Sequence, residues 1–297
     1  MQVATSLFYD RASRAMGTLS GKADSLQTQL STTKRLSKPS DDSVAYARLQ
    51  TIARADADAS VTAQNLDLAA ASIASADTTL DAITSQIQRA SELALQARSG
   101  SMSAEGREAI ATELGTIVDQ LVSLANSKDA RGQPLFGGPD GGAAVVKNVD
   151  GSFTFSTTLP SAIPVGDGGA IQPGDTGLKL FAGTTGNTLQ AISDLAAALH
   201  AGQPADATLA TAIGDIAAGG ERIAAVQASL GARASRVELE QAALTHAGVD
   251  REALRSGLED TDITATIAEL QKTMTILSAT QASFSKLQGL SLFDYLR

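Results

Sequence analysis

The sequence predicts a mainly α-helical protein, a long rod-like antiparallel helical bundle with terminal coiled-coil helices and a small β-rich insert at its tip. Apolar residues recur at steps of three and four near both ends of the 297-residue chain, and such heptad stripes bury themselves only against another helix. Aromatic residues make up 3% of the chain and Trp is absent, which suits closely spaced helices better than several dense cores. Gly and Pro gather in one central region, which predicts turns and short strands there.

The C-terminal stripe runs for more than three heptads, with Gln281 as an interruption. Its apolar members are Ile263, Ile267, Leu270, Met274, Leu277 and Phe284. The apolar pattern then continues to the end of the chain through Leu287, Leu290, Leu292, Phe293, Tyr295 and Leu296. An apolar, aromatic-bearing tail in a soluble chain must be covered by something.

A second heptad stripe lies at the other end of the chain, at Ala12, Met16, Leu19, Ala23, Leu26 and Leu30. No visible segment between the two stripes would cover either, so we expect them to pair with each other or with neighbouring molecules. The first helix is expected to end near Leu36, because Pro39 disfavours helical geometry at Lys38.

The run Ser40-Asp41-Asp42 reads as the start of the next helix. We expect Ser40 to cap free backbone N–H groups and the two carboxylates to favour the positive end of the helix dipole. Capping is a better reading of Asp41 and Asp42 than a metal or acid–base pair, because no His or third carboxylate lies nearby. Helical periodicity then covers 43–99. After a break at 99–101, a helix capped by Ser103 should complete an antiparallel hairpin.

From Asn126 onward the composition changes to Gly and Pro. A β-hairpin is expected over 143–158 around a tight turn at Asp150-Gly151, with further short strands at 170–171 and 178–181. The glycines lack the context of a phosphate-binding loop or a dinucleotide fingerprint, so they read as turn residues. Helices are then expected over 188–201 and 206–218, and a long one from Glu221 with a break near Gly248.

The predicted organisation has five parts. They are an N-terminal coiled-coil segment (1–42), a helical hairpin (43–135), a variable β-rich insert (136–187), short helices with a returning long helix (188–259), and a C-terminal coiled-coil segment (260–297).

Composition excludes several classes of function. The net charge of −9 argues against nucleic-acid binding. The first 54 residues oppose this trend, with eight Lys and Arg against four Asp, and we interpret them as a solvated helix face. The absence of Cys removes disulfides, thiolate catalysis and Cys-ligated zinc. We expect no membrane insertion and no cleavable secretory signal, since no long apolar segment occurs.

No residue pattern indicates catalysis. The two histidines, His200 and His246, have no second His or carboxylate at ligand spacing, and no Gly-x-Ser-x-Gly occurs. We therefore expect no enzyme, no metal and no cofactor.

Three motifs carry a resemblance to the hook–filament junction proteins (hook-associated protein 3) of the bacterial flagellin superfamily. The first is 33–42, Thr-Lys-Arg-Leu-Ser-Lys-Pro-Ser-Asp-Asp, although Ser43 stands where the family often has Pro. The second is 135–138, Leu-Phe-Gly-Gly, and the third is the ending 290–296, Leu-Ser-Leu-Phe-Asp-Tyr-Leu. Arg297 instead echoes the ending of flagellin. The resemblance covers roughly 1–140 and 220–297.

The resemblance implies a structural protein of the bacterial flagellum that leaves the cell unfolded through the flagellar type III export apparatus. It implies a ring of copies of this chain between hook-associated protein 1 and flagellin, with the terminal segments as inner core. Neighbouring subunits would then cover the apolar tail. The assembly interface would hold Leu19, Leu26, Leu30, Pro39, Asp41, Asp42, Ile267, Leu270, Met274, Leu277 and Phe284. An export chaperone could contact Leu287, Leu290, Leu292 and Phe293.

Two alternatives remain open at this point. The chain could be flagellin itself, the bulk filament subunit, although the Pro-Ser-Asp-Asp run and the Phe-Asp-Tyr-Leu ending favour the junction protein. More remotely, the middle of the chain could be a surface binding module, but the insert shows no site.

Overall fold

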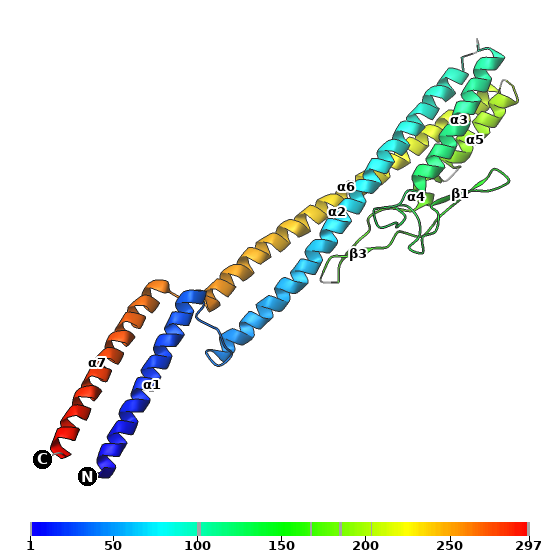
Figure 1. The fold of residues 1–297 in the computed structure, drawn as a ribbon. Helices are drawn as coiled ribbons and strands as arrows, with labels where there is room; N and C mark the ends of the chain where they lie inside the picture. The colour runs from blue at the N-terminus through cyan, green and yellow to red at the C-terminus, as the bar shows by residue number, and fades with distance from the viewer. Residues whose placement is uncertain (1, 100–101, 167, 184–185, 203, 296–297) are drawn as a thin grey trace. The chain divides into compact units, whose positions relative to one another are not determined.

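The computed structural model describes residues 2–99, 102–166, 168–183, 186–202 and 204–295, and within these ranges side chains are described for Leu7 and for 9–286. The chain divides into two compact units, which are described separately. Unit 1 comprises Met1–Ala57 and Ala247–Arg297, and unit 2 comprises Asp58–His246. The helices are α1 (Gln2–Thr32), α2 (Ser43–Ala97), α3 (Ala104–Ala125), α4 (Gly177–Phe181), α5 (Thr188–His200), α6 (Asp206–Glu259) and α7 (Ile263–Tyr295). The protein is therefore mainly α, as predicted, and α2 and α6 contribute to both units (Figure 1).

Unit 2 holds the hydrophobic core of the chain. Its α2 buries a row of residues seven apart, as predicted from the sequence: Leu66, Ile73, Leu80 and Ile87. Helix α6 runs antiparallel to α2, because Gln241 and Gln227 donate hydrogen bonds to Asp67 and Asp81 at 2.8 and 2.7 Å. Helix α3 is capped by Ser103, whose hydroxyl accepts from the Gly106 amide at 3.1 Å, also as predicted. Figure 1 shows α3 and α5 beside α2 and α6.

Helix α6 corrects the expected division of this region. It is continuous from Asp206 to Glu259, through Gly219-Gly220 and through Gly248, where breaks were expected. At Gly219 the reason is close packing, since an added Cβ would lie 2.5 Å from the hydroxyl oxygen of buried Thr188. This glycine therefore allows the start of α5 to approach α6 and does not end a helix.

The insert contains two small antiparallel strand pairs. Strand β1 (Val145–Lys147) pairs with β2 (Phe153–Phe155), and β3 (Ile163–Pro164) pairs with β4 (Ala170–Ile171). The first hairpin was predicted, but its connection spans 148–152, longer than the expected two-residue turn. The segment expected as a strand at 178–181 belongs to the short helix α4, which is capped by Thr176.

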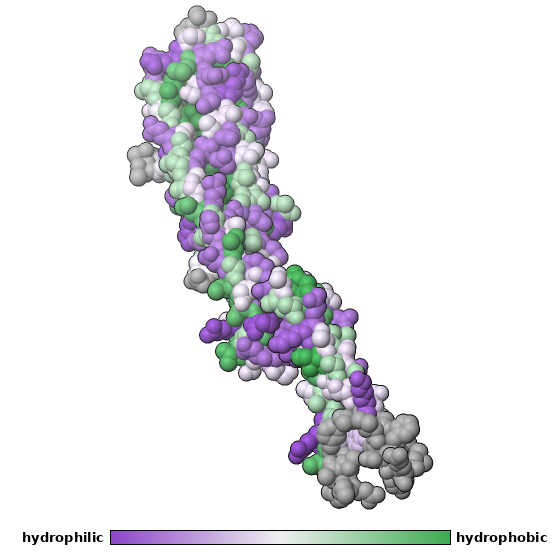
Figure 2. All heavy atoms as spheres, turned by 90° about the vertical axis from the view of Figure 1, so that its left-hand side faces the viewer, coloured by the Kyte–Doolittle hydropathy of each residue, from purple (hydrophilic) through white to green (hydrophobic). Residues whose placement is uncertain are grey.

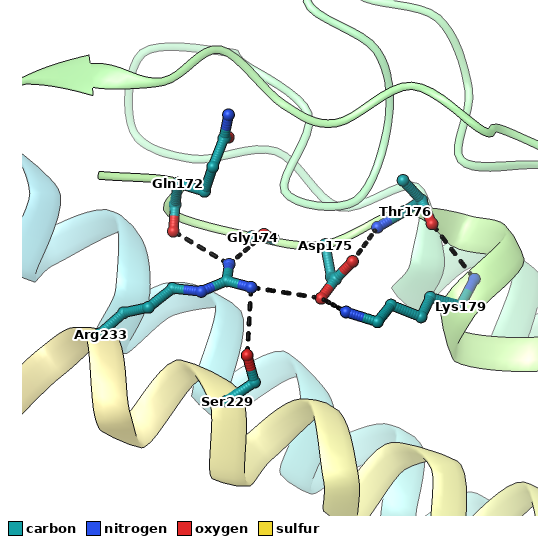
Figure 3. A network of polar contacts seen from close by, with 7 residues as sticks. All are labelled: Gln172, Gly174, Asp175, Thr176, Lys179, Ser229 and Arg233. Carbon is teal, nitrogen blue, oxygen red and sulfur yellow. Dashed lines mark hydrogen bonds and ion pairs between the residues drawn. The ribbon is translucent and has the colours of Figure 1, made fainter. Parts of the chain in front are cut away.

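The insert packs against the sides of the unit 2 helices and not at their tip. Gly166 lies against Thr62 of α2, and the Asn126 side chain, just after α3, exchanges two hydrogen bonds with the Val145 backbone. A further connection runs to α6, through the polar network of Figure 3. There Arg233 donates to the Gln172 and Gly174 carbonyls, at 3.1 and 2.7 Å.

Candidate assembly interface

Helices α1 and α7 of unit 1 form an antiparallel pair. Lys22 is paired with Glu269 in the middle of the helices, and the rings of Tyr9 and Phe284 meet edge to face with centroids 5.4 Å apart. Both contacts fit one antiparallel register: the residue numbers add to 291 for Lys22 and Glu269 (22 + 269) and to 293 for Tyr9 and Phe284 (9 + 284). Figure 1 shows the helices side by side, with both chain ends at the same end of the pair.

The predicted N-terminal stripe faces this seam. Ala23 is buried, and the other members, Ala12, Met16, Leu19, Leu26 and Leu30, are half-buried on a helix whose remaining described residues are mostly exposed. Thus the residues proposed for α1 occupy the α7 side of the helix.

The predicted C-terminal stripe divides between two faces of α7. Leu270, Leu277 and Phe284 are half-buried beside α1, whereas Ile267 and Met274, in the next row around the helix, are exposed by 42% and 49%. Ile263 lies in the row of the leucines but at the first residue of α7, where it is 49% exposed. The most buried residues of the helix are instead Thr266 and Thr273, 7% and 2% exposed. Apolar periodicity missed them because Thr was not counted as apolar. Their seven-residue spacing, continued at Thr280, was the available signal.

A short clasp joins the connections that follow α1 and α6. It consists of residues 33–35 and 258–261, all in unit 1. The Arg35 amide donates to the Glu259 carbonyl at 2.6 Å, and the Thr261 amide donates to the Thr33 carbonyl at 3.0 Å. The Arg35 guanidinium also donates to the Leu258 carbonyl, at 2.9 Å. α1 ends at Thr32 and not near Leu36, because Thr33 adopts the left-handed conformation (φ 58°) that leads into the clasp.

The two aspartates of the Pro-Ser-Asp-Asp run have separate structural tasks. Asp42, not the expected Ser40, caps α2, since its carboxylate accepts from the Val44 and Ala45 amides at 3.1 and 2.9 Å. Asp41 closes the preceding loop by accepting from the Ser37 and Lys38 amides at 3.0 and 2.9 Å. These backbone hydrogen bonds, first that of Ser37, hold the pKa of Asp41 below its ordinary value. Both contacts fit the capping interpretation.

Unit 1 lacks a core of its own among the residues whose side chains are described. Of the 43 buried hydrophobic residues, only Ala23, Leu36 and Ala45 lie in it. It nevertheless carries 8 of the 15 exposed large hydrophobic residues. Figure 2 likewise shows hydrophobic side chains at the surface between hydrophilic ones. Such a surface indicates contact with other molecules.

The remaining predicted site residues lie outside the seam between α1 and α7 or outside the described side chains. Pro39 is exposed in the loop between α1 and α2. The side chains of Leu287, Leu290, Leu292 and Phe293 lie outside the described residues, although their backbone belongs to α7.

No arrangement for catalysis or metal binding emerges in the described part of the chain. There, no group of three or more His, Asp and Glu residues is placed to hold a metal ion. His200 pairs with Glu108 at 2.8 Å across the ends of α5 and α3, and both side chains are exposed. Within the same residues, no helix is both long and apolar enough to cross a bilayer.

Comparison with known proteins identifies the class of protein to which this chain belongs. The N-terminal helical region of bacterial flagellin matches residues 3–140, and the C-terminal helical region of bacterial flagellin matches residues 214–296. Together these matches cover well over half of the sequence, and the chain belongs to the flagellin superfamily.

Individual relatives narrow this assignment. Flagellar hook-associated protein 3 of Salmonella typhimurium is 25% identical over 318 residues, which span all of both chains. A flagellin of Listeria monocytogenes is 24% identical over 262 residues, covering 88% of this chain and 85% of its own. The crystal structure of the flagellar junction protein FlgL from Legionella pneumophila shares the fold, with a TM-score of 0.59 at 15% identity over 72% of this chain and all of that one. These matches favour the hook–filament junction proteins over flagellin itself.

Proposed function

We propose that this protein is the junction adaptor of a bacterial flagellum, joining the hook-associated ring to the flagellin filament. One observation carries the proposal beyond the family. Unit 1 pairs two long helices yet leaves a row of apolar side chains uncovered, whereas unit 2 closes a complete core. A chain built in this way is suited to act as one subunit among many, with unit 1 as its assembly surface.

The proposed partners follow from that role. Further copies of this chain would form a ring, with hook-associated protein 1 on one side and flagellin on the other. The proposed interface consists of residues of α1, of α7 and of the loop between α1 and α2. They are Leu19, Leu26, Leu30, Pro39, Asp41, Asp42, Ile267, Leu270, Met274, Leu277 and Phe284. In this arrangement Asp41 and Asp42 act by shaping the loop and capping α2.

Export through the flagellar type III apparatus accompanies this proposal. The chain would pass unfolded to the cell exterior, and the absence of Cys means that no disulfide could lock it beforehand. An export chaperone would hold the tail at Leu287, Leu290, Leu292 and Phe293 before assembly. We propose no catalytic role, no cofactor, no nucleic-acid partner and no membrane insertion.

Removal of the gene from the bacterium that encodes it tests the proposal. We expect bare hooks by electron microscopy, with intact flagellin released into the medium, because filament without its adaptor cannot anchor. Missing filaments without released flagellin would instead identify the chain as a filament subunit.

A substitution in the seam tests where assembly occurs. Leu277→Asp places a charge beside α1 in a half-buried position and should abolish filament attachment while the chain is still exported. Ala279→Asp is the matched control, because it adds the same charge on the exposed side of α7 that carries Lys272 and Lys286. Normal motility of the Leu277→Asp strain would count against the seam as an interface.

A further inference from the structure

We infer that the groove between α2 and α6 of unit 2 is a docking site for a cationic amphipathic helix of another protein. The groove is formed by residues 67–81 of α2 and 227–241 of α6. This inference does not depend on the junction role proposed above, because it concerns unit 2 and a partner other than a copy of this chain. It rests on the shape of the groove, on its charge and on the spacing of two carboxylates at its rim.

The groove is hollow in its middle and is lined there by small residues. A cavity of about 400 Å³ lies between the two helices, over the buried side chains of Ile73, Leu230 and Val237. The other apolar or small residues that line it are Ala70, Ala74, Gly231 and Ala234. The distance between two packed helices depends on the side chains at their contact, so small residues on both walls let a third helix approach closely.

The rest of unit 2 packs on the opposite side of the two helices. Thr62 of α2 lies against Gly166 of the insert, and on α6 Gly219 lies against Thr188 while Arg233 binds the insert. On a heptad projection, Thr62, Gly219 and Arg233 fall in one row, and the groove residues fall on the other side of the buried row. Figure 1 likewise shows the insert, α3 and α5 on the same side of α2. The groove is therefore left open to a partner.

Two hydrogen bonds between the helices mark the ends of the groove. Gln241 donates to Asp67 at 2.8 Å at one end, and Gln227 donates to Asp81 at 2.7 Å at the other. The 14 residues from Asp67 to Asp81 span about 21 Å of helix, which is roughly four turns. A docked helix of ordinary length can lie along this distance.

The rim of the groove is acidic. Its four carboxylates are all exposed, and they belong to Asp67, Asp77, Asp81 and Glu238. The first and third accept from the two Gln side chains. Among the residues whose side chains are described, Asp77 and Glu238 have no hydrogen-bond or ion-pair partner.

No cation of the two helices balances this charge. Helix α2 carries no Lys or Arg between Arg54 and Arg89. The cations in this stretch of α6 are Arg233 and Arg236, and their ion-pair partners are Asp175 of the insert and Glu240, which do not line the groove. The surface that remains is apolar in the middle and negative at its edges, which is complementary to an amphipathic helix with Lys or Arg beside its apolar face.

The two unpaired carboxylates are spaced so that one helix can reach both. In the register set by the Gln–Asp hydrogen bonds, Asp77 lies opposite Gly231 and Glu238 lies opposite Ala70. The carboxylates are thus seven residues apart along the pair, about 10.5 Å. Residues i and i+7 of a docked helix have the same spacing and the same face. We therefore expect a partner with Lys or Arg at i and i+7 and with small or apolar residues between them.

A second copy of the groove does not fit this site. Two copies would bring the same four carboxylates together, and like charges across an interface suppress association. The occupant is therefore assigned to a different protein.

A synthetic peptide tests the inference on the full-length chain. The matched probe is a fluorescently labelled helical peptide of about 20 residues, with two Lys seven residues apart on a face of Ala and Leu. The control peptide has the same composition with the two Lys on opposite faces. In anisotropy titrations at about 0.15 M salt, where exposed charges are screened, we expect the matched peptide to bind at least about tenfold more tightly. Equal binding of the two peptides would overturn the inference.

Charge variants locate the peptide on the protein. Asp77→Asn combined with Glu238→Gln should weaken binding of the matched peptide by about tenfold or more. The control combines Asp194→Asn with Glu221→Gln, which removes the same charge from exposed positions that do not line this groove. An equal loss in both double variants would mean that the peptide senses only net charge, and the assigned groove would be wrong.

A shape variant tests the groove without changing charge. Gly231→Leu should fill the hollow and weaken binding, and the chain should still fold, because a Cβ at Gly231 meets no atom within 4 Å. Gly214→Leu is the matched control on the same helix, since its Cβ also meets open space, and circular dichroism compares the helix content of both. Unchanged binding to Gly231→Leu would place the peptide elsewhere. Self-association of the wild-type chain that Gly231→Leu abolishes would identify a second copy as the occupant and overturn the assignment to another protein.

Discussion

The network that ties the insert to α6 permits a quantitative prediction. Arg233 lies 24% exposed, and one of its terminal nitrogens donates to two backbone carbonyls of the insert. The other terminal nitrogen donates to Ser229 and lies 3.4 Å from the carboxylate of Asp175. Asp175 is 2% exposed and is also held by Lys179 at 2.8 Å (Figure 3). Its carboxylate further accepts from the Thr176 amide at 3.0 Å.

Arg233→Met removes the guanidinium but keeps much of the apolar stem. The substitution leaves two part-buried carbonyls without their donor and removes one of the two cationic partners of a buried carboxylate. We expect it to lower the free energy of unfolding of unit 2 by about 2–4 kcal/mol, because a carbonyl left without its donor away from water costs about 1–3 kcal/mol and Asp175 keeps only one of its two cationic partners. Lys179→Met is the matched control. That side chain is 59% exposed, so its loss should cost about 0–1 kcal/mol.

Guanidinium unfolding followed by far-ultraviolet circular dichroism measures both variants, since α3, α4, α5 and most of α2 and α6 lie in unit 2 and contribute to the helical signal. Hydrogen exchange over residues 172–182 then shows whether the loss begins in the insert, where protection should fall first. If Arg233→Met costs no more than Lys179→Met, or if exchange over 172–182 is unchanged, the network does not anchor the insert and the reasoning fails.

Three further predictions concern packing, the clasp and pH. Gly219→Ala should destabilise unit 2 by about 1–3 kcal/mol through overpacking, whereas Gly214→Ala on the same helix, where a Cβ meets open space, should stabilise it by up to about 1 kcal/mol; thermal melts that rank the two the other way would contradict the model of close approach. Arg35→Ala should weaken the clasp and lower hydrogen-exchange protection in α1 and the start of α7, and unchanged protection would show that the clasp is dispensable. The side-chain hydrogen bond from Lys22 lowers the pKa of Glu269 from its ordinary 4.5. The contribution of this ion pair to the stability of the α1–α7 pair is therefore present above about pH 4.5 and is lost as the pH falls through the lowered value. Because Tyr9 contacts Phe284 across the same helix pair, near-ultraviolet circular dichroism of tyrosine should follow this loss, and Lys22→Met should remove the pH dependence.

Sequence patterns could predict the helices but not all of their ends and breaks. The cap at Ser103 follows from local chemistry, so it was predictable, whereas α2 begins at Ser43, three residues beyond the expected cap at Ser40. Gly219 was expected to end a helix, but glycine also occurs where two segments pack closely. Only the position of Thr188 shows that Gly219 serves close packing. The segment 178–181 alternates like a strand, yet the cap at Thr176 and burial of Leu180 and Phe181 favour a helical turn.

The candidate site was predictable to a similar degree. Apolar periodicity located both terminal helices, but it could not separate the side of α7 that meets α1 from the side left uncovered. That separation depends on where the second helix lies, which the spacing of Thr266 and Thr273 indicates only once their burial is known. The cap at Asp42 was missed in favour of Ser40 because both residue types cap helices, and the choice depends on loop geometry.

The charge of the chain is divided as unevenly as its core. Unit 2 holds 20 Asp and Glu against 10 Lys and Arg, a net charge of −10, while unit 1 holds 12 against 13, a net charge of +1. Copies of unit 2 therefore repel one another, which favours solubility and opposes contact between them. Copies of unit 1 have no such barrier and have apolar surface to bury. On the proposed junction role, this difference directs association to unit 1 and leaves unit 2 hydrated.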